Sequence, residues 1–194
     1  MSRQTQSATE ATDQRVNGLD VEALQQVIGE IERDAAKGIV EFRVKSAWKG
    51  QTRCEATVDS YTIGGETVKR DFKIAVDEPL ELLGENTAAN PQELLMTALN
   101  ACVTVGYVAG ASVRGITLDK LEIETVGELD LRGFLGIDET VPPGYEKIRY
   151  VVRIKGDGTP EQFDEIHRTV IKTSPNYFNM SRPIQIDADL VVED

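Results

Sequence analysis

Residues 90–113 read NPQELLMTALNACVTVGYVAGASV, and this stretch predicts the central element of the structure. It opens with Asn90-Pro91-Gln92-Glu93, which supplies an N-cap, a first-turn proline and a glutamate that closes a capping box. From position 94 to position 113 no side chain is charged. The pattern predicts an apolar helix over residues 91–113, long enough to span a small domain.

A stretch of this length and polarity has a second interpretation, a single membrane span. Gly106 and Gly110 have the spacing of a membrane helix-packing motif. Four polar residues lower the mean hydropathy of the run, however: Thr97, Asn100, Thr104 and Ser112. We therefore expect a buried helix of a soluble protein, with no membrane partner. A membrane-anchored protein is the alternative, which extraction only with detergent would support.

Charge and composition exclude several classes of function. The chain has 194 residues, with 21 Lys+Arg, 33 Asp+Glu and a net charge of −12. Phosphate binding needs a concentrated positive surface, so we expect neither nucleic acid nor an anionic membrane as partner. A single histidine, His167, excludes a His-rich metal site, and we expect no metal and no cofactor.

The two cysteines, Cys54 and Cys102, are too few for a disulfide scaffold. With no apolar leader at the N-terminus, the chain is expected to be cytoplasmic and its thiols reduced. Residues 1–18 are polar and without periodicity, and we expect them to form a mobile tail. Residues 19–194 are expected to form a single domain.

The remaining patterns predict an α+β fold with largely antiparallel sheets. Helices are expected over residues 20–36 and 160–173. Strands are expected over residues 40–48, 54–59, 68–76, 121–126, 147–155 and 184–190. Gly64-Gly65 predicts a hairpin turn. Opposite charges on the outer faces of 121–126 and 147–155 favour their pairing. The apolar loop 131–137 should pack on something, and a second subunit is one candidate.

Three side chains are candidates for chemistry, each with a structural alternative. Cys102 is either a reactive thiol or a small buried hydrophobe. Glu93 stands nine residues before it, more than ten ångströms along one helix, so it can reach only the Cys102 of another subunit. Its alternative role is the capping box. Arg70 falls on the apolar face of its strand, where it is either functional or a rim arginine with a packed stem. Cys54 is expected to be a core residue.

The chain resembles the OsmC/Ohr family of osmotically inducible and organic hydroperoxide resistance proteins, over about residues 39–192. The resemblance rests on Asn90-Pro91-Gln92-Glu93-Leu94-Leu95 with Cys102, then on Gly115-Ile116-Thr117-Leu118 and Thr173-Ser174-Pro175. It implies an intertwined α+β homodimer in which the cysteine helices of two subunits pack centrally. It also implies a thiol peroxidase for organic hydroperoxides, with Cys102 as the attacking cysteine and Glu93 orienting an arginine near it.

Two departures from the family pattern bear on activity. The resolving cysteine of the family corresponds to Ser174, so its internal disulfide cannot form. The activating arginine is not evident, and Arg70 is the one substitute candidate. The loop before the cysteine helix carries Asp77, Glu78, Glu81 and Glu85, whose charges would disfavour a thiolate.

Two hypotheses of function follow. The first is a one-cysteine thiol peroxidase, whose Cys102 is oxidised by a hydroperoxide and reduced by an external thiol. The second is a catalytically degenerate OsmC-like protein that binds a small hydrophobic ligand at the dimer interface. A guanidinium beside the Cys102 sulfur would favour the first, and only aliphatic neighbours would favour the second.

Overall fold

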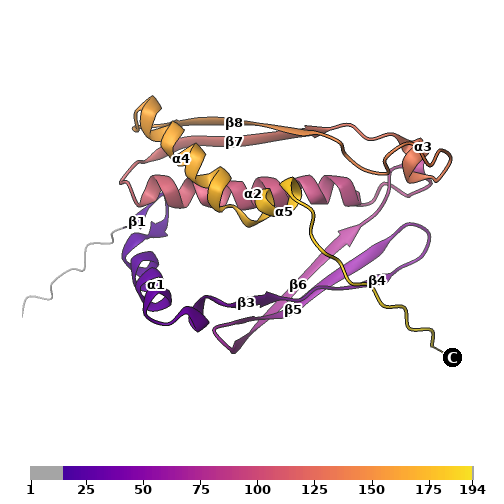
Figure 1. The fold of residues 1–194 in the computed structure, drawn as a ribbon, viewed down its shortest axis with the longest axis horizontal. Coiled ribbons are helices and arrows are strands. Elements are labelled where there is room, and N and C mark those ends of the chain that lie inside the picture. Colours follow the sequence, from indigo (N-terminus) through magenta and orange to yellow (C-terminus); the bar gives the residue numbers. More distant parts are fainter. Residues whose placement is uncertain (1–14, 194) are drawn as a thin grey trace, which may run out of the picture.

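The computed structural model describes residues 15–193 and places them in two layers (Figure 1). One layer holds the long helix α2 (Pro91–Ser112), the helices α4 (Pro160–Thr173) and α5 (Pro175–Ser181), and the antiparallel strands β7 (Leu118–Gly127) and β8 (Ile148–Gly156). The other holds α1 (Val21–Arg33) and the strands β3 (Val40–Phe42), β4 (Lys45–Trp48), β5 (Cys54–Ile63) and β6 (Glu66–Val76). Short elements complete the chain: β1 (Arg15–Val16), β2 (Leu19–Asp20), the 3-10 turns Ala35–Gly38 and Leu80–Leu82, and α3 (Leu131–Phe134).

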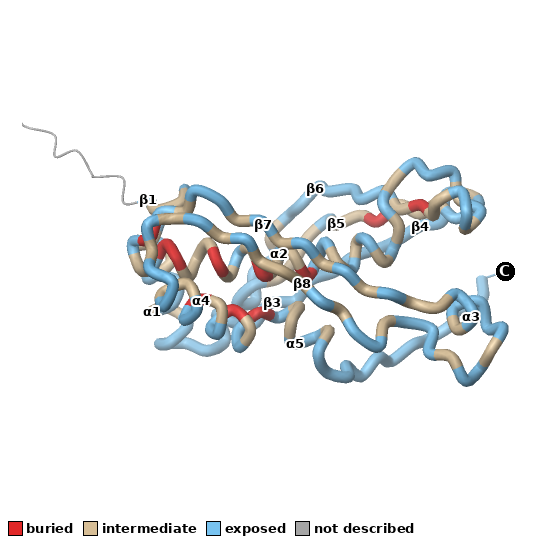
Figure 2. The backbone as a smooth tube through the Cα atoms, turned by 90° about the horizontal axis from the view of Figure 1, so that it is seen from above, coloured by how far each residue is buried: buried red, intermediate tan, exposed pale blue. Residues whose placement is uncertain are grey.

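The core lies where α2 packs against α4 and the β7–β8 ribbon. Buried residues recur every fourth position along α2, at Leu99, Val103, Tyr107 and Ala111, and they cluster with Ile116, Ile166 and Val170. Most of the residues coloured as buried in Figure 2 belong to the layer that holds α2 and α4. A four-residue repeat keeps the same face of α2 against its neighbours, so the buried residues of α2 lie along one side of the helix.

Two glycines allow α2 and α4 to approach closely. A Cβ at Gly106 would lie 3.1 Å from Cγ2 of Val170, and one at Gly110 would lie 3.0 Å from Cγ2 of Ile166. The small residues of the uncharged run thus serve helix–helix contact inside this chain. By length and composition α2 also passes as a membrane span, as core helices of soluble proteins do.

The β7–β8 ribbon follows the predicted charge pairing. Glu122 lies opposite Arg153 in the antiparallel register, and Arg153 Nη1 donates to Glu124 Oε2 at 2.9 Å. Gly64 and Gly65, with φ of 55° and 83°, close the β5–β6 hairpin as expected for a turn that needs positive φ. Helices close to the predicted bounds form at 91–112 and 160–173.

Two predicted strands are wrong in detail. The single strand 40–48 is divided into β3 and β4, which pair with different parts of β5. The strand predicted over 184–190 does not form: residues 182–193 lie outside any helix or strand, and nearly all are exposed. Alternation of apolar residues marks a segment suited to a sheet, but a strand also needs a partner edge. Within residues 15–193 this segment has none.

The N-terminal tail prediction does not hold for residues 15–18, and its residues 1–14 lie outside the described part. Residues 15–20 form the β1–β2 hairpin, with Asn17 at φ 54° in its turn. The Asn17 amide donates to the Ile116 carbonyl at 2.9 Å and to Ser112 Oγ at 3.1 Å, while Leu118 N–H donates to Asn17 Oδ1 at 2.8 Å. The hairpin is thereby fixed to the end of α2 and the start of β7.

Candidate functional site

Cys102 lies on α2 with its sulfur 3.2 Å from Ser174 Oγ. Cys102 is half-buried, and Ser174 is 6% exposed. Ser174 sits at the junction of α4 and α5: its N–H donates to the Val170 carbonyl at 2.8 Å, and its Oγ accepts from the Tyr177 N–H at 3.3 Å. The two helix ends therefore set the position of this hydroxyl. The residue matched to the family's resolving position stands beside the matched attacking thiol.

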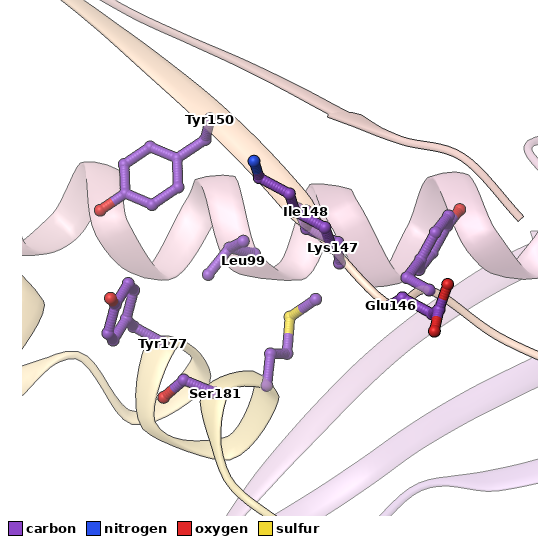
Figure 3. A pocket seen from close by; sticks show the side chains of 9 residues that line it. Leu99, Glu146, Lys147, Ile148, Tyr150, Tyr177 and Ser181 are labelled. Atoms are coloured by element: carbon purple, nitrogen blue, oxygen red, sulfur yellow. The ribbon is translucent and has the colours of Figure 1, made fainter.

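A cavity of about 310 Å³ lies between α2, β8 and α5, and neither Cys102 nor Ser174 is among the residues that line it (Figure 3). Leu99, one helical turn before Cys102, lies on one side of it, and Tyr177, one turn after Ser174, lies on another. The lining is mainly aromatic and aliphatic, with one acid and one lysine: Leu99, Tyr145, Glu146, Lys147, Ile148, Tyr150, Tyr177, Met180 and Ser181. An apolar cavity with few polar groups is typical of small-molecule sites.

Tyr150 brings an unsatisfied polar atom to this cavity. Its hydroxyl is buried and has no hydrogen-bond partner among residues 15–193, while its ring meets that of Tyr177 edge to face at 6.4 Å. Burial, and then the neighbouring Tyr177, raise the pKa of Tyr150 above its ordinary value. At neutral pH the group is a phenol, and it can donate a hydrogen bond to a ligand.

His167 makes a hydrogen bond within the core. Its Nδ1 is hydrogen-bonded to the hydroxyl of Tyr107, which is 2% exposed. Burial, followed by the proximity of Tyr150, raises the pKa of Tyr107. Because the Tyr107–His167 pair satisfies a buried hydroxyl of the core, it needs no catalytic explanation.

Glu93 forms the predicted capping box. Its side chain accepts from the Asn90 N–H at 2.9 Å, and its own N–H donates to Asn90 Oδ1 at 2.8 Å. Both arms of the motif are present. Within this chain Glu93 lies in the first turn of α2 and does not meet Cys102, in keeping with its nine-residue separation from the thiol.

Arg70 lies on β6 and is exposed. Its guanidinium stacks over Phe72, 4.5 Å from the ring centre, and stands 5.7 Å from the ring centre of Tyr61. This is the geometry of an arginine held by aromatic faces. The structure does not bring Arg70 to Cys102 within the chain, and the one side-chain partner found for the sulfur among residues 15–193 is a hydroxyl.

The acidic loop before α2 is satisfied only in part, because Glu78 Oε2 is buried without a hydrogen-bond partner among residues 15–193. Asp77 is fully buried, and its carboxylate accepts from Thr52 Oγ1, from Thr87 Oγ1 and from three backbone N–H groups. Burial alone would raise the pKa of Asp77, but these hydrogen bonds bring it well below its usual range. Glu85 pairs with Arg53 at 2.9 Å. Two of the four carboxylates of this loop are therefore compensated locally.

Arg53 is a residue that the sequence patterns do not single out. Its Nη1 pairs with Glu85, and its Nε is buried without a partner. It thereby places an arginine against the loop that leads into α2. Strand alternation puts this residue at a polar position before Cys54, a common place for a solvated side chain, so no signal distinguishes it.

The chain belongs to the OsmC-like protein family, whose sequence model matches residues 84–189. Among solved structures, an OsmC-like protein from Mycoplasma pneumoniae is similar at a TM-score of 0.57 and 17% identity, covering 73% of this chain and 87% of that one. An OsmC-like protein of unknown function from Vibrio cholerae is similar at 0.51 and 15%, covering 71% and 92%. No curated protein sequence matches the chain. The expected α+β fold with antiparallel sheets is thus confirmed as OsmC-like.

Proposed function

We propose that this protein is a one-cysteine thiol peroxidase that reduces organic hydroperoxides through Cys102. The observation that supports the proposal is the half-buried Cys102 sulfur, which meets a hydroxyl at 3.2 Å. Leu99 and Tyr177, each about one helical turn from this pair, line an apolar cavity. A hydroxyl can donate to a thiolate, and the cavity offers apolar surface for the organic part of a hydroperoxide. Among residues 15–193 the printed partner of the sulfur is this hydroxyl, which is neither of the two expected neighbourhoods, a guanidinium or aliphatic groups alone.

In the proposed reaction the Cys102 thiolate attacks the terminal oxygen of the hydroperoxide. A sulfur–oxygen bond forms as the oxygen–oxygen bond breaks, and the alkoxide that leaves takes a proton from solvent to become an alcohol. The sulfur is oxidised by two electrons to a sulfenic acid. An external thiol then condenses with the sulfenic acid and releases water, and a second thiol restores Cys102 and leaves as the oxidised disulfide.

We further propose that the working form is a cytoplasmic homodimer. Large apolar side chains are exposed on the single chain at Val105 of α2 (68%), at Phe42 (77%) and Trp48 (76%) of the second layer, and at Ile186 (83%) of the C-terminal segment. Extensive apolar exposure is typical of a surface that another molecule covers. A second copy is the occupant that the family resemblance implies. It would bring Glu93 and an arginine, Arg70 or Arg53, toward the neighbouring Cys102.

The direct test is the intact mass after exposure to a substoichiometric amount of cumene hydroperoxide. We expect one added oxygen in the wild type and in Cys54→Ser, and none in Cys102→Ser. Turnover with a dithiol reductant should depend on Cys102 in the same way. A Cys102 that reacts no faster than free cysteine would refute the peroxidase.

A second candidate function, binding of a small hydrophobic ligand without turnover, is favoured by the Tyr150 hydroxyl. A buried donor without a partner beside an apolar cavity is suited to a ligand that carries an acceptor. Native mass spectrometry of the purified protein tests this candidate. A copurified ligand that is lost in Tyr150→Phe would support it, and hydroperoxide turnover would argue against it.

A further inference from the structure

The hydroxyl of Ser174 faces two groups at once. Its oxygen accepts the Tyr177 N–H at 3.3 Å, because Ser174 is the N-cap of α5. The same oxygen lies 3.2 Å from the Cys102 sulfur. Ser174 is almost wholly buried, at 6% exposure, and its backbone is held at the end of α4 by the bond to Val170. The hydroxyl therefore has little freedom to turn toward water.

The direction of the contact follows from the chemistry of the two groups. A backbone N–H is a donor only, so the Tyr177 bond uses a lone pair of Ser174 and leaves its proton available. A thiolate is an acceptor only, so when Cys102 is ionised the Ser174 proton must be the one shared between them. A hydrogen bond to a charged group is stronger than one between neutral groups. The contact thus favours the ionised sulfur over the neutral thiol.

We propose that Ser174 is a positioning residue that donates a hydrogen bond to the Cys102 sulfur and holds it as a thiolate. A serine at this place cannot form a disulfide with Cys102, so here the neighbour of the attacking sulfur is a hydrogen-bond donor rather than a redox partner. The role concerns the reduced protein and needs no hydroperoxide. It deepens the proposed peroxidase at the same site, but it is tested separately from it.

The test is the rate of alkylation of Cys102 by iodoacetamide as a function of pH, measured in the full chain with Cys54→Ser so that one thiol reacts. In Ser174→Ala we expect the midpoint of the profile to move to higher pH. We expect the rate at neutral pH to fall about tenfold, the size of one charge-assisted hydrogen bond. Ser174→Gly, which keeps a backbone suited to an N-cap, should give the same shift if the alanine variant folds poorly.

The matched control is Thr159→Ala. Thr159 is the N-cap of α4, and its hydroxyl accepts the Gln162 N–H at 3.3 Å without contact to a cysteine. Its loss should leave the alkylation profile at that of the parent. A wild-type profile in Ser174→Ala and Ser174→Gly would overturn the proposal, and so would an equal shift in Thr159→Ala. Because no peroxide is used, a shift in the serine variants would stand even if Cys102 proved inert toward hydroperoxides.

Discussion

At the scale of single residues, burial decides which polar groups matter. Ser174, Asp77 and Tyr150 each have a buried polar atom, and they differ in what that atom meets: a sulfur, a set of donors, and nothing. A satisfied group stabilises the fold, whereas an unsatisfied one is costly unless a ligand completes it. The three residues therefore predict three different responses to substitution.

Replacing Ser174 by cysteine should place a second sulfur against Cys102. The 3.2 Å contact shows that the Cys102 sulfur already lies beside the atom that the new sulfur would replace, and the formation of a bridge tests whether the Cβ atoms also meet disulfide geometry. Oxidation of Ser174→Cys with diamide should give a monomer mass lower by two hydrogens, and the same treatment of Ser174→Cys with Cys102→Ser should not. Two free thiols after oxidation would contradict the geometry.

Asp77→Asn should lower stability and flatten its dependence on acid. The folded pKa of Asp77 lies below its unfolded value, so the carboxylate stabilises the protein above the ordinary aspartate pKa of about 3.9. This contribution is lost as pH falls through the folded pKa. Urea unfolding at pH 7 should show a reduced midpoint in Asp77→Asn, and the gap to the wild type should narrow near pH 3. A constant gap would assign the effect to packing instead.

Tyr150→Phe should leave the unfolding midpoint unchanged or slightly higher in the ligand-free protein, because it removes a buried hydroxyl without a partner. Tyr107→Phe is the matched control, since it removes a buried hydroxyl that is paired with His167. The control should lower stability by about 1–3 kcal/mol, measured by chemical denaturation. Equal losses in the two variants would mean that the Tyr150 hydroxyl is satisfied in solution.

At the scale of elements, the loss of stability caused by a larger side chain depends on what that side chain contacts. Gly110→Val should destabilise the protein by about 1–3 kcal/mol, because the added carbons meet Ile166 of α4. Gly29→Val is the control: Gly29 also lies within a helix, but an added Cβ would meet nothing within 4 Å. Its effect should stay within about 0.5 kcal/mol. Thermal unfolding of the pair measures how tightly α2 and α4 are packed.

The elements also show how far sequence patterns reach. The capping box of α2 was predictable, because a cap involves residues within four positions of one another. The β7–β8 pairing was predictable, because one strand has an acidic outer face and the other a basic one. The division of 40–48 and the missing strand at 184–190 were not, since both depend on which edge lies alongside. The cavity was not predictable either. Alternation predicts that Tyr150 faces the core, but no sequence pattern indicates that its hydroxyl lacks a hydrogen-bond partner among the described residues.

At the scale of the whole molecule, the described chain buries few residues and exposes many large apolar side chains. Its core is formed by α2, α4 and the β7–β8 ribbon, while the layer of β3 to β6 keeps large apolar side chains exposed. This arrangement is expected if a second copy completes it.

If the proposed homodimer forms through α2, Val105→Glu should shift the protein toward monomer in size-exclusion chromatography with light scattering. Val105 is on α2 and 68% exposed in the single chain, so a charge there costs little unless another chain covers it. Val105→Thr, of similar volume and uncharged, should remain dimeric. A wild-type chain that elutes as a stable monomer would dismiss the dimer.

The hydrogen bonds of Asn17 to Ile116 and Leu118 have a consequence for folding during synthesis. Its bond to the Ile116 carbonyl spans 99 residues, and that to Leu118 spans 101. During synthesis the first hairpin leaves the ribosome long before its docking site does, because translation adds residues at a limited rate. The β1–β2 hairpin can dock only after about a hundred further residues have been synthesised. Closing so long a loop is slow compared with forming local contacts. The β1–β2 hairpin is thus synthesised well before the residues that hold it in place.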